Sequence, residues 1–318
     1  MTVRDISMYQ MVQGGKVMRT TASDRIPAEF EVHDERFRGT GGDRVVERIF
    51  DGGRWVEGPA YSPAWRCLVF SDIPNDRVLR WDETTGAVGV WQQPAGHVNG
   101  HTIDRAGRLV RCEQGHRRLT RVEPDGRLTV LAERWRGLRF NSPNDVVEHS
   151  DGSLWFTDPS YGIDSDYEGH RAEPEIDGCH VYRVAPGGEV TRVADDLVRP
   201  NGLAFSADER TLFVVDTRRK HIRRFSVGDD GALGGGDVFA DCTAGTFDGI
   251  RLDEHGRLWA AAHDGLHCFG DDGTLLGKLK LPQVCSNLTF GGPRRTVLYV
   301  TATTAVYSIM LNVSGARV

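Results

Sequence analysis

Residues 199–205 have the sequence RPNGLAF, in which an asparagine–glycine pair leads directly into a short apolar segment. Related phrases occur five more times along the chain: VEGPAY, VNGHTI, PNDVVE, FDGIRL and SNLTF. Their polar or acidic opening residues recur at intervals of about 40 to 57 residues, and they are Glu57, Asn99, Asn144, Asn201, Asp248 and Asn287. A recurrence of this length is typical of propeller arrays.

Each repeat has the same internal order. A brief alternating segment is followed by a turn such as DRAG, HSDG or DEHG, then by an apolar segment such as SLWFTD or RLWAAA, and then by a further strand. A small antiparallel sheet of this kind cannot bury both of its faces alone, and radial closure of several sheets leaves few edges exposed. The sequence therefore predicts an all-β protein, a six-bladed β-propeller with four-stranded antiparallel blades around a central channel. The alternative, a two-domain α+β protein, requires a helical periodicity that does not persist beyond a turn or two.

The domain organisation follows from where the repeat begins. Residues 1–43 do not match the unit and are predicted to form an N-terminal arm, and residues 44–318 are predicted to form one propeller domain. The segment DRVVERIFDGG, residues 43–53, resembles a strand that completes the last blade. A polar insertion at residues 162–178 is expected to form a loop over one end of the array.

Composition favours a soluble globular enzyme or binding protein. Of the 318 residues 39% are hydrophobic and 26% are charged, and the net charge of −6 does not indicate a surface for nucleic acid. No apolar run approaches the roughly 20 residues that span a bilayer, and the N-terminus lacks the apolar stretch of a secretion signal. We therefore expect a cytoplasmic protein that binds a small molecule and neither nucleic acid nor membrane. The six cysteines show no zinc-site spacing and are interpreted as core residues.

The opening residues predict a metal site. In a propeller the innermost strands line the channel, so residues at equivalent positions converge on one axis. Glu57, Asn144, Asn201 and Asp248 would bring two carboxylates and two amides to a common point. Ligation by oxygen alone favours Ca²⁺, with Mg²⁺, Mn²⁺ and Zn²⁺ as alternatives. The competing interpretation is that some of these pairs are ordinary turn dipeptides.

The same motifs carry a family resemblance. The strings EGPAYSP, LVFSDIPNDRVLRWD, RFNSPNDVV, DGSLWFTDPSYG, RPNGLAFSADERTLFVVDT, FDGIRLDEHGRLW and NLTFGGPRRTVLYVT occur in this order, and from about residue 28 to its end the chain resembles the SMP-30/gluconolactonase/luciferin-regenerating-enzyme family, close to its bacterial gluconolactonase-type members. The resemblance implies a six-bladed propeller that hydrolyses lactones or related esters. It also implies a catalytic divalent metal, usually Ca²⁺, at the positions of Glu57, Asn144, Asn201 and Asp248.

These residues suggest a mechanism in which the metal polarises a lactone carbonyl. Asp248 is the candidate general base for the attacking water, a role that the family assigns to the matching aspartate, and pure ligation is the alternative.

Near the channel mouth, hydrogen-bonding side chains are candidates for binding a polyhydroxylated ring, and they are Asn99, His101, Arg139, Asn141 and Tyr161. In the family an arginine and an asparagine close to the N-D motif contact the sugar lactone, and the spacing leaves open which asparagine of NSPND corresponds. Asp158, which precedes a proline, is interpreted as the cap of a turn.

Two other functions are compatible with a propeller that has a polar axis. A phosphotriesterase or arylesterase of the diisopropylfluorophosphatase or paraoxonase kind would use the same metal to polarise a phosphoryl oxygen. A non-enzymatic binding propeller would use its rim. A serine hydrolase is disfavoured because no G-x-S-x-G elbow is present. Among lactones, the family resemblance implies a hexonolactone such as D-glucono-1,5-lactone first, with pentonolactones and uronic-acid lactones as alternatives.

Overall fold

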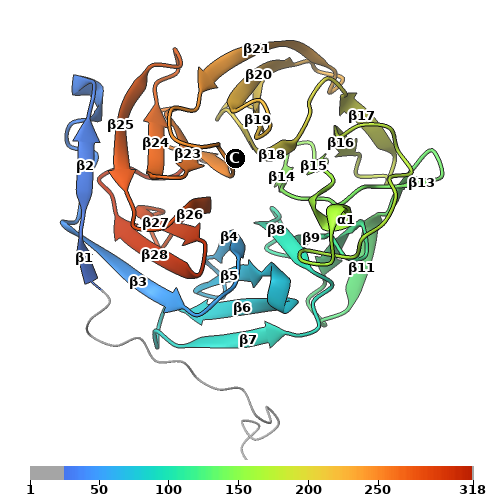
Figure 1. The fold of residues 1–318 in the computed structure, drawn as a ribbon, viewed down its shortest axis with the longest axis horizontal. Helices are drawn as coiled ribbons and strands as arrows, with labels where there is room; N and C mark the ends of the chain where they lie inside the picture. Colours follow the sequence, from blue (N-terminus) through green and yellow to red (C-terminus); the bar gives the residue numbers. More distant parts are fainter. Residues whose placement is uncertain (1–24, 317–318) are drawn as a thin grey trace, which may run out of the picture.

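Six small antiparallel sheets surround a central channel in the computed structural model, which describes residues 25–316 (Figure 1). The predicted six-bladed β-propeller is confirmed. Residues 1–24 of the predicted arm lie outside the described residues. Within residues 25–316 the α-helical structure is limited to α1 (Tyr161–Asp164), and short 3₁₀ turns occur at η2 (Glu35–Phe37) and η3 (Ile73–Asn75). No helix in residues 25–316 has the length and apolar character needed to cross a membrane.

Successive strands follow one another from the channel outward. The first blade contains β4 (Val56–Ser62), β5 (Cys67–Asp72), β6 (Arg77–Asp82) and β7 (Val88–Gln92). The second contains β8 (Val98–Ile103), β9 (Leu109–Glu113), β10 (Arg118–Val122) and β11 (Leu128–Ala132). The third contains β14 (Val146–Glu148), β15 (Leu154–Asp158), β16 (His180–Val184) and β17 (Val190–Ala194). Between the second and third blades a two-stranded hairpin is formed by β12 (Arg134–Trp135) and β13 (Leu138–Arg139).

The remaining three blades follow the same order. The fourth contains β18 (Pro200–Phe205), β19 (Thr211–Asp216), β20 (His221–Val227) and β21 (Leu233–Asp241). The fifth contains β22 (Ile250–Leu252), β23 (Leu258–Ala262), β24 (Gly265–Phe269) and β25 (Leu275–Lys280). The sixth contains β26 (Cys285–Gly291), β27 (Val297–Ala302), β28 (Ala305–Met310) and β3 (Val45–Asp51).

The last blade is closed by a strand from the other end of the chain, as the segment at residues 43–53 predicts. Strand β3 pairs with β28, with Phe50 opposite Val306. The described part of the arm continues this pairing, because β1 (Arg25–Pro27) joins β3 and β2 (Glu29–Val32) joins β25 as a fifth strand. These pairings cover the outer edges of the fifth and sixth blades, which would otherwise be open to association with other strands.

Apolar side chains hold neighbouring blades together. Within the described residues the buried apolar side chains form six clusters, one at each interface between adjacent blades. At the third interface, for example, Trp155 packs edge-on against Phe205 with ring centroids 5.4 Å apart. The core is therefore a ring of inter-blade contacts around the channel, which leaves the channel itself available for polar side chains.

The insertion at residues 162–178 lies between β15 and β16 and begins within α1. It folds back on itself, since the backbone N–H of His170 donates to the carbonyl of Gly162 at 2.9 Å. Gly162 also packs closely against Gln114 and Ser142, which places the start of the insertion over the second and third blades (Figure 1).

Candidate active site in the channel

Local irregularities in the first strands direct the opening residues. The pairing of the first and second strands shifts register between Glu57 and Ala60, between Val98 and His101, and between Pro200 and Leu203. A β-bulge bends a strand and changes the direction of its side chains. Asn144 and Asp248 lie just before β14 and β22. The opening residues thus occupy the same end of the channel in successive blades.

The glycine that follows most opening residues has a steric function. A Cβ atom on Gly58 would overlap the carbonyl oxygen of Asn99, and one on Gly100 would overlap that of Asn144. The N–H of Gly100 also donates to the carbonyl of Asn144 at 2.8 Å. Each glycine therefore lets the next blade bring its own opening residue close to the axis. Gly58 and Gly100 lie inside strands β4 and β8, so these pairs are not the hairpin turns of the competing interpretation.

A cavity of about 190 Å³, here called the channel pocket, opens at this end of the channel. Its lining is mostly polar and comes from all six blades and the insertion: Trp55, Glu57, Asn99, Asn144, Tyr161, Glu168, Asn201, Thr217, Thr246, Asp248, His263, Val284 and Cys285. All four predicted metal ligands are present, together with Asn99 and Tyr161 from the predicted substrate-binding set. The repeat thus brings Glu57 and Asp248, which are 191 positions apart in the sequence, to one cavity.

Two carboxylates in this pocket lack a cationic partner. Burial is the largest cause that holds the pKa of Glu57 well above its usual range, and the charge of Asp248 adds to it. Burial also raises the pKa of Asp248, followed by the charges of Glu168 and Asp145. Neither Glu57 nor Asp248 forms a salt bridge with any residue between 25 and 316. Buried carboxylates are costly without a counter-charge, so this pair, with two amide oxygens nearby, suits a hard divalent cation.

Backbone and side-chain contacts fix the predicted ligands before anything binds. The N–H of Asn144 donates to the carbonyl of Thr157 at 2.9 Å, and the N–H of Asp248 donates to that of Ala261 at 3.1 Å. The amide nitrogen of Asn201 donates to Thr217 Oγ1 at 3.1 Å. These bonds tie Asn144, Asn201 and Asp248 to the second strand of the same blade or to the residue that follows it. The strands of the blades therefore hold these predicted ligands in place.

Two of the other predicted substrate-binding residues are buried beside the pocket and do not line it. His101 Nδ1 bonds the carbonyl oxygen of Gly58 at 2.7 Å, and burial lowers the pKa of His101 to about 3, so the ring is neutral. The amide nitrogen of Asn141 donates to the carbonyl of Gly178 at 2.9 Å. His101 supports the strand that carries Glu57, and Asn141 anchors the end of the insertion.

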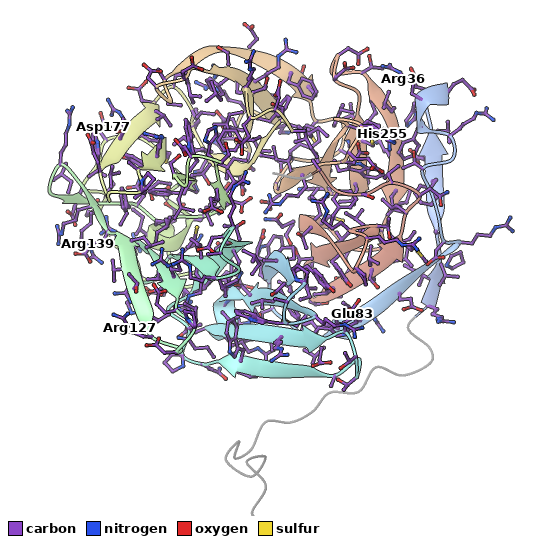
Figure 2. All side chains as sticks on the ribbon, turned by 180° about the vertical axis from the view of Figure 1, so that it is seen from behind. Arg36, Glu83, Arg127, Arg139, Asp177 and His255 are labelled. Carbon is purple, nitrogen blue, oxygen red and sulfur yellow. The ribbon has the colours of Figure 1, made fainter. Side chains whose placement is uncertain are left out.

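Arg139 is also outside the channel pocket. It lies on the β12–β13 hairpin, where its N–H donates to Glu175 at 2.8 Å and its guanidinium donates to the carbonyl of His116 at 3.2 Å. Figure 2 shows Arg139 at the outer edge of the molecule. The hairpin carries this side chain away from the axis although only five residues separate it from Asn144 in the sequence.

Several lining residues were missed by sequence reasoning. Glu168 is the most consequential, because it is the third carboxyl group of the channel pocket. The sequence predicted that the insertion lies over one end of the array, and the position of Glu168 confirms this. The insertion contains six acidic residues, however, and no pattern in the sequence distinguishes the one that faces the pocket. Thr217, which follows β19, also lacks a motif of its own.

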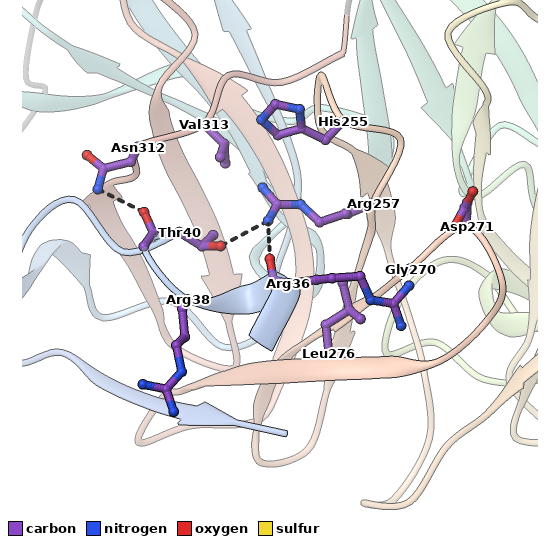
Figure 3. Close-up of a pocket in the computed structure, with 11 residues that line it drawn as sticks. Arg36, Arg38, Thr40, His255, Arg257, Gly270, Asp271, Leu276, Asn312 and Val313 are labelled. Atoms are coloured by element: carbon purple, nitrogen blue, oxygen red, sulfur yellow. Dashed lines mark hydrogen bonds between the residues drawn. The ribbon is translucent and has the colours of Figure 1, made fainter. Parts of the chain in front are cut away.

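A second cavity, of about 480 Å³, lies between η2 and the fifth blade and is lined by Arg36, Arg38, Thr40, His255 and Arg257 among others (Figure 3). Its arginines are already paired with carboxylates. Arg257 Nε donates to Asp253 at 2.8 Å, and Arg36 forms ion pairs with Asp34 and Asp272. The cavity is larger than the channel pocket, but its described lining residues include no pair of buried, unpaired carboxylates, so the channel pocket is the stronger candidate for the active site.

Comparisons with known proteins identify the family of the chain. Residues 55–304 match the family described as the SMP-30/gluconolactonase/LRE-like region. The chain is 30% identical to a gluconolactonase of Zymomonas mobilis, over 85% of this chain and 82% of that protein. It is 29% identical to a pentonolactonase of Haloferax volcanii, over 81% and 84% respectively. The solved structure of a gluconolactonase from Xanthomonas campestris superposes with a TM-score of 0.87 at 37% identity, covering 93% of this chain and all of that one. The chain therefore belongs to the SMP-30/gluconolactonase/LRE-like family.

Proposed function

We propose that the chain is a metal-dependent sugar-lactone hydrolase that acts in the channel pocket. Its family membership and its lactonase relatives make it a lactone-hydrolysing enzyme. The observation that supports the metal is the pair Glu57 and Asp248, two buried carboxyl groups beside amide side chains with no cation among their protein partners. The relatives are named for gluconolactone and pentonolactone, and these are the first substrates to test.

Glu57, Asn144, Asn201 and Asp248 would hold one divalent cation. Because all four offer oxygen, Ca²⁺ is favoured, and Mg²⁺, Mn²⁺ and Zn²⁺ are alternatives to be tested. When bound, the cation polarises the lactone carbonyl and offsets the negative charge that develops on its oxygen. Glu57 serves only to bind, since a carboxylate beside a cation is stabilised as the anion.

Asp248 is proposed to activate the water. Its carboxylate accepts a proton as the water oxygen bonds to the carbonyl carbon, and it returns that proton to the ring oxygen as the acyl C–O bond breaks. The product is the open hydroxy acid. The N–H of Asp248 donates to the carbonyl of Ala261, and the N–H of Gly202 donates to the carbonyl of Asp248. These two hydrogen bonds hold the backbone at Asp248. A fixed base contributes about 10²- to 10⁴-fold in rate.

Asn99, Tyr161 and Thr217 are proposed to orient the sugar ring by hydrogen bonds to its hydroxyl groups. All three line the pocket. The guanidinium of Arg199 lies over the ring of Tyr161, 4.8 Å from its centroid, and fixes that ring. A volume of about 190 Å³ is below the usual range for drug-sized ligands, so the pocket fits a single ring better than an oligosaccharide.

The test uses protein stripped with a chelator. Opening of D-glucono-1,5-lactone and of pentonolactones is measured with Ca²⁺, Mg²⁺, Mn²⁺ or Zn²⁺ added back, and metal binding is measured separately by calorimetry. The variants are Glu57→Gln and Asp248→Asn, with Asp271→Asn, an exposed residue of the second cavity, as the matched control.

We expect metal-dependent activity that Glu57→Gln loses together with metal affinity and that Asp248→Asn reduces by at least about 100-fold in kcat. Asp271→Asn should match the wild type. Full activity in stripped protein or in Asp248→Asn would contradict the mechanism. Metal binding without activity on any lactone would instead favour phosphotriesters as the substrates.

A further inference from the structure

Glu168 brings a third carboxyl group to the channel pocket, from a segment that belongs to no blade. It lines the cavity with Glu57 and Asp248, and its charge contributes to the raised pKa values of both. Within residues 25–316 Glu168 itself forms no hydrogen bond or ion pair through its carboxyl group. Both of its oxygens are therefore available to a molecule in the pocket.

The residues on either side of Glu168 are held firmly. Gly169 packs so closely on the carbonyl of Gly162 that a Cβ atom would overlap it, and the N–H of His170 donates to the same carbonyl at 2.9 Å. The His170 ring meets the His97 ring edge-on with centroids 5.2 Å apart. On the other side, the Arg54 guanidinium lies 5.3 Å from the centre of the Tyr167 ring. The loop is thus fixed at its base and against the first blade, and it presents Glu168 in a defined direction.

The charge of the pocket is one-sided. No lysine or arginine is among its lining residues, whereas three carboxyl groups are. A single divalent cation would offset two of them, which leaves one negative charge near the substrate. The uncharged lining groups, such as Asn99, Tyr161, Thr217 and Thr246, suit hydroxyl groups. An anionic substituent on the substrate would meet repulsion and no basic side chain.

We propose that Glu168 determines substrate specificity: its carboxylate accepts hydrogen bonds from the hydroxyl groups of a neutral polyhydroxylated lactone and excludes lactones that carry an anionic group. This inference rests on the proposed lactone hydrolysis. It means that a residue of the insertion selects substrates according to their charge. Glu168 is a binding residue in this scheme. It takes no part in the bond-breaking step.

The test compares two lactones that differ only at C6. D-Glucono-1,4-lactone carries a hydroxymethyl group there, and D-glucaro-1,4-lactone carries a carboxylate. kcat and KM are measured for wild type, Glu168→Gln and Glu173→Gln, where Glu173 is an exposed acidic residue of the same insertion. The measurements are made at pH 8, above the pKa of about 7 that burial gives Glu168. Binding of Ca²⁺ and of the neutral, non-hydrolysable D-glucono-1,5-lactam is measured by calorimetry.

In Glu168→Gln we expect KM for the neutral lactone to rise about 10-fold, because one hydrogen bond to a charged acceptor is weakened, while kcat changes less. KM for the carboxylate-bearing lactone should fall, so that the preference for the neutral substrate drops by 10-fold or more. The lactam should bind more weakly, Ca²⁺ should still bind, with an affinity lowered only by the loss of one nearby charge, and Glu173→Gln should behave as wild type.

An unchanged preference in Glu168→Gln would overturn the inference, and so would the abolition of Ca²⁺ binding, which would make Glu168 a metal ligand. These results are distinct from a failure of the proposed function. If wild type opens no lactone, the proposed function fails, and the lactam titration still shows whether Glu168 binds a neutral polyol.

Discussion

A Cβ atom added to Gly202 would stand 2.5 Å from the carbonyl oxygen of Asp248 in the neighbouring blade. The N–H of Gly202 donates to that same oxygen at 3.2 Å. The proposed base is therefore positioned by a residue of the fourth blade that has no side chain. The equivalent contact of Gly100 with Asn144 shows the same principle between the second and third blades.

Gly202→Ala should push the backbone at Asp248 away from the axis. Forcing one methyl group into a packed site costs about 1–3 kcal/mol of folding free energy. We also expect a lower metal affinity and kcat, because Asp248 moves. The measurements are denaturant unfolding, metal calorimetry and lactone kinetics. Gly89→Ala is the control, since a Cβ atom there meets nothing within 4 Å. Equal behaviour of the two variants would contradict the positioning role of Gly202.

The propeller and its axial residues could be predicted from sequence because both follow from one repeating unit. Equivalent positions in equivalent blades must meet near the axis. The sequence therefore identifies four residues as neighbours without any knowledge of their contacts: Glu57, Asn144, Asn201 and Asp248. Arg139 and Asn141 were predicted from their closeness to Asn144 in the chain and from the family resemblance. Neither residue lines the channel pocket, because the β12–β13 hairpin turns Arg139 outward and the Asn141 amide donates to the carbonyl of Gly178. The insertion is not part of the repeat, so no equivalent position in another blade indicates where its side chains lie. For this reason Glu168 was not identified from the sequence.

Asp158 makes stability depend on pH. As interpreted from sequence, it caps a turn, accepting the N–H groups of Asn141 and Ser142 at 2.8 Å each. Burial nevertheless raises the pKa of Asp158 to about 7. Between about pH 4, the usual range for an unfolded aspartate, and about pH 7, the folded chain binds the additional proton. The contribution of Asp158 to stability therefore falls as the pH rises through this window.

Unfolding in urea at pH 5, 6, 7 and 8 tests this dependence. Asp158→Asn should be less stable than wild type at pH 5, by about 1–3 kcal/mol, because an amide oxygen replaces two acceptors and one N–H loses its partner. Its stability should also fall less than that of wild type from pH 5 to pH 8. Asp125→Asn, at an exposed position, is the control. Parallel curves for wild type and Asp158→Asn would show that Asp158 does not titrate in this range.

The described part of the arm should contribute to the stability of the propeller. Phe37 in η2 is buried, and its ring centroid lies 5.8 Å from that of Trp259 in the fifth blade. Removing a buried aromatic ring costs about 3–5 kcal/mol, so Phe37→Ala should lower the unfolding midpoint strongly. Val32→Ala, at an exposed site of β2, should have little effect. A midpoint unchanged in Phe37→Ala would mean that the arm folds independently of the blades.

Arg251 and Asp145 form an ion pair inside the channel. Asp145 stands where four other blades have glycine after the opening residue, and it is fully buried. Arg251 Nη1 lies 3.1 Å from Asp145 Oδ2, and it also donates to the carbonyl of Ile250 at 2.7 Å. The guanidinium thus balances the carboxylate next to the proposed ligand Asn144.

A double-mutant cycle separates the pair from its members. Arg251→Met leaves Asp145 buried without a counter-charge, which should cost about 3 kcal/mol, at the low end for buried pairs because 18% of the Arg251 side chain stays exposed. Asp145→Asn combined with Arg251→Met should lose less than the sum of the two single variants, since no isolated charge remains. Thermal and denaturant unfolding of all four proteins measure the coupling. Additive losses would mean that Arg251 stabilises the fold through packing and not through its charge.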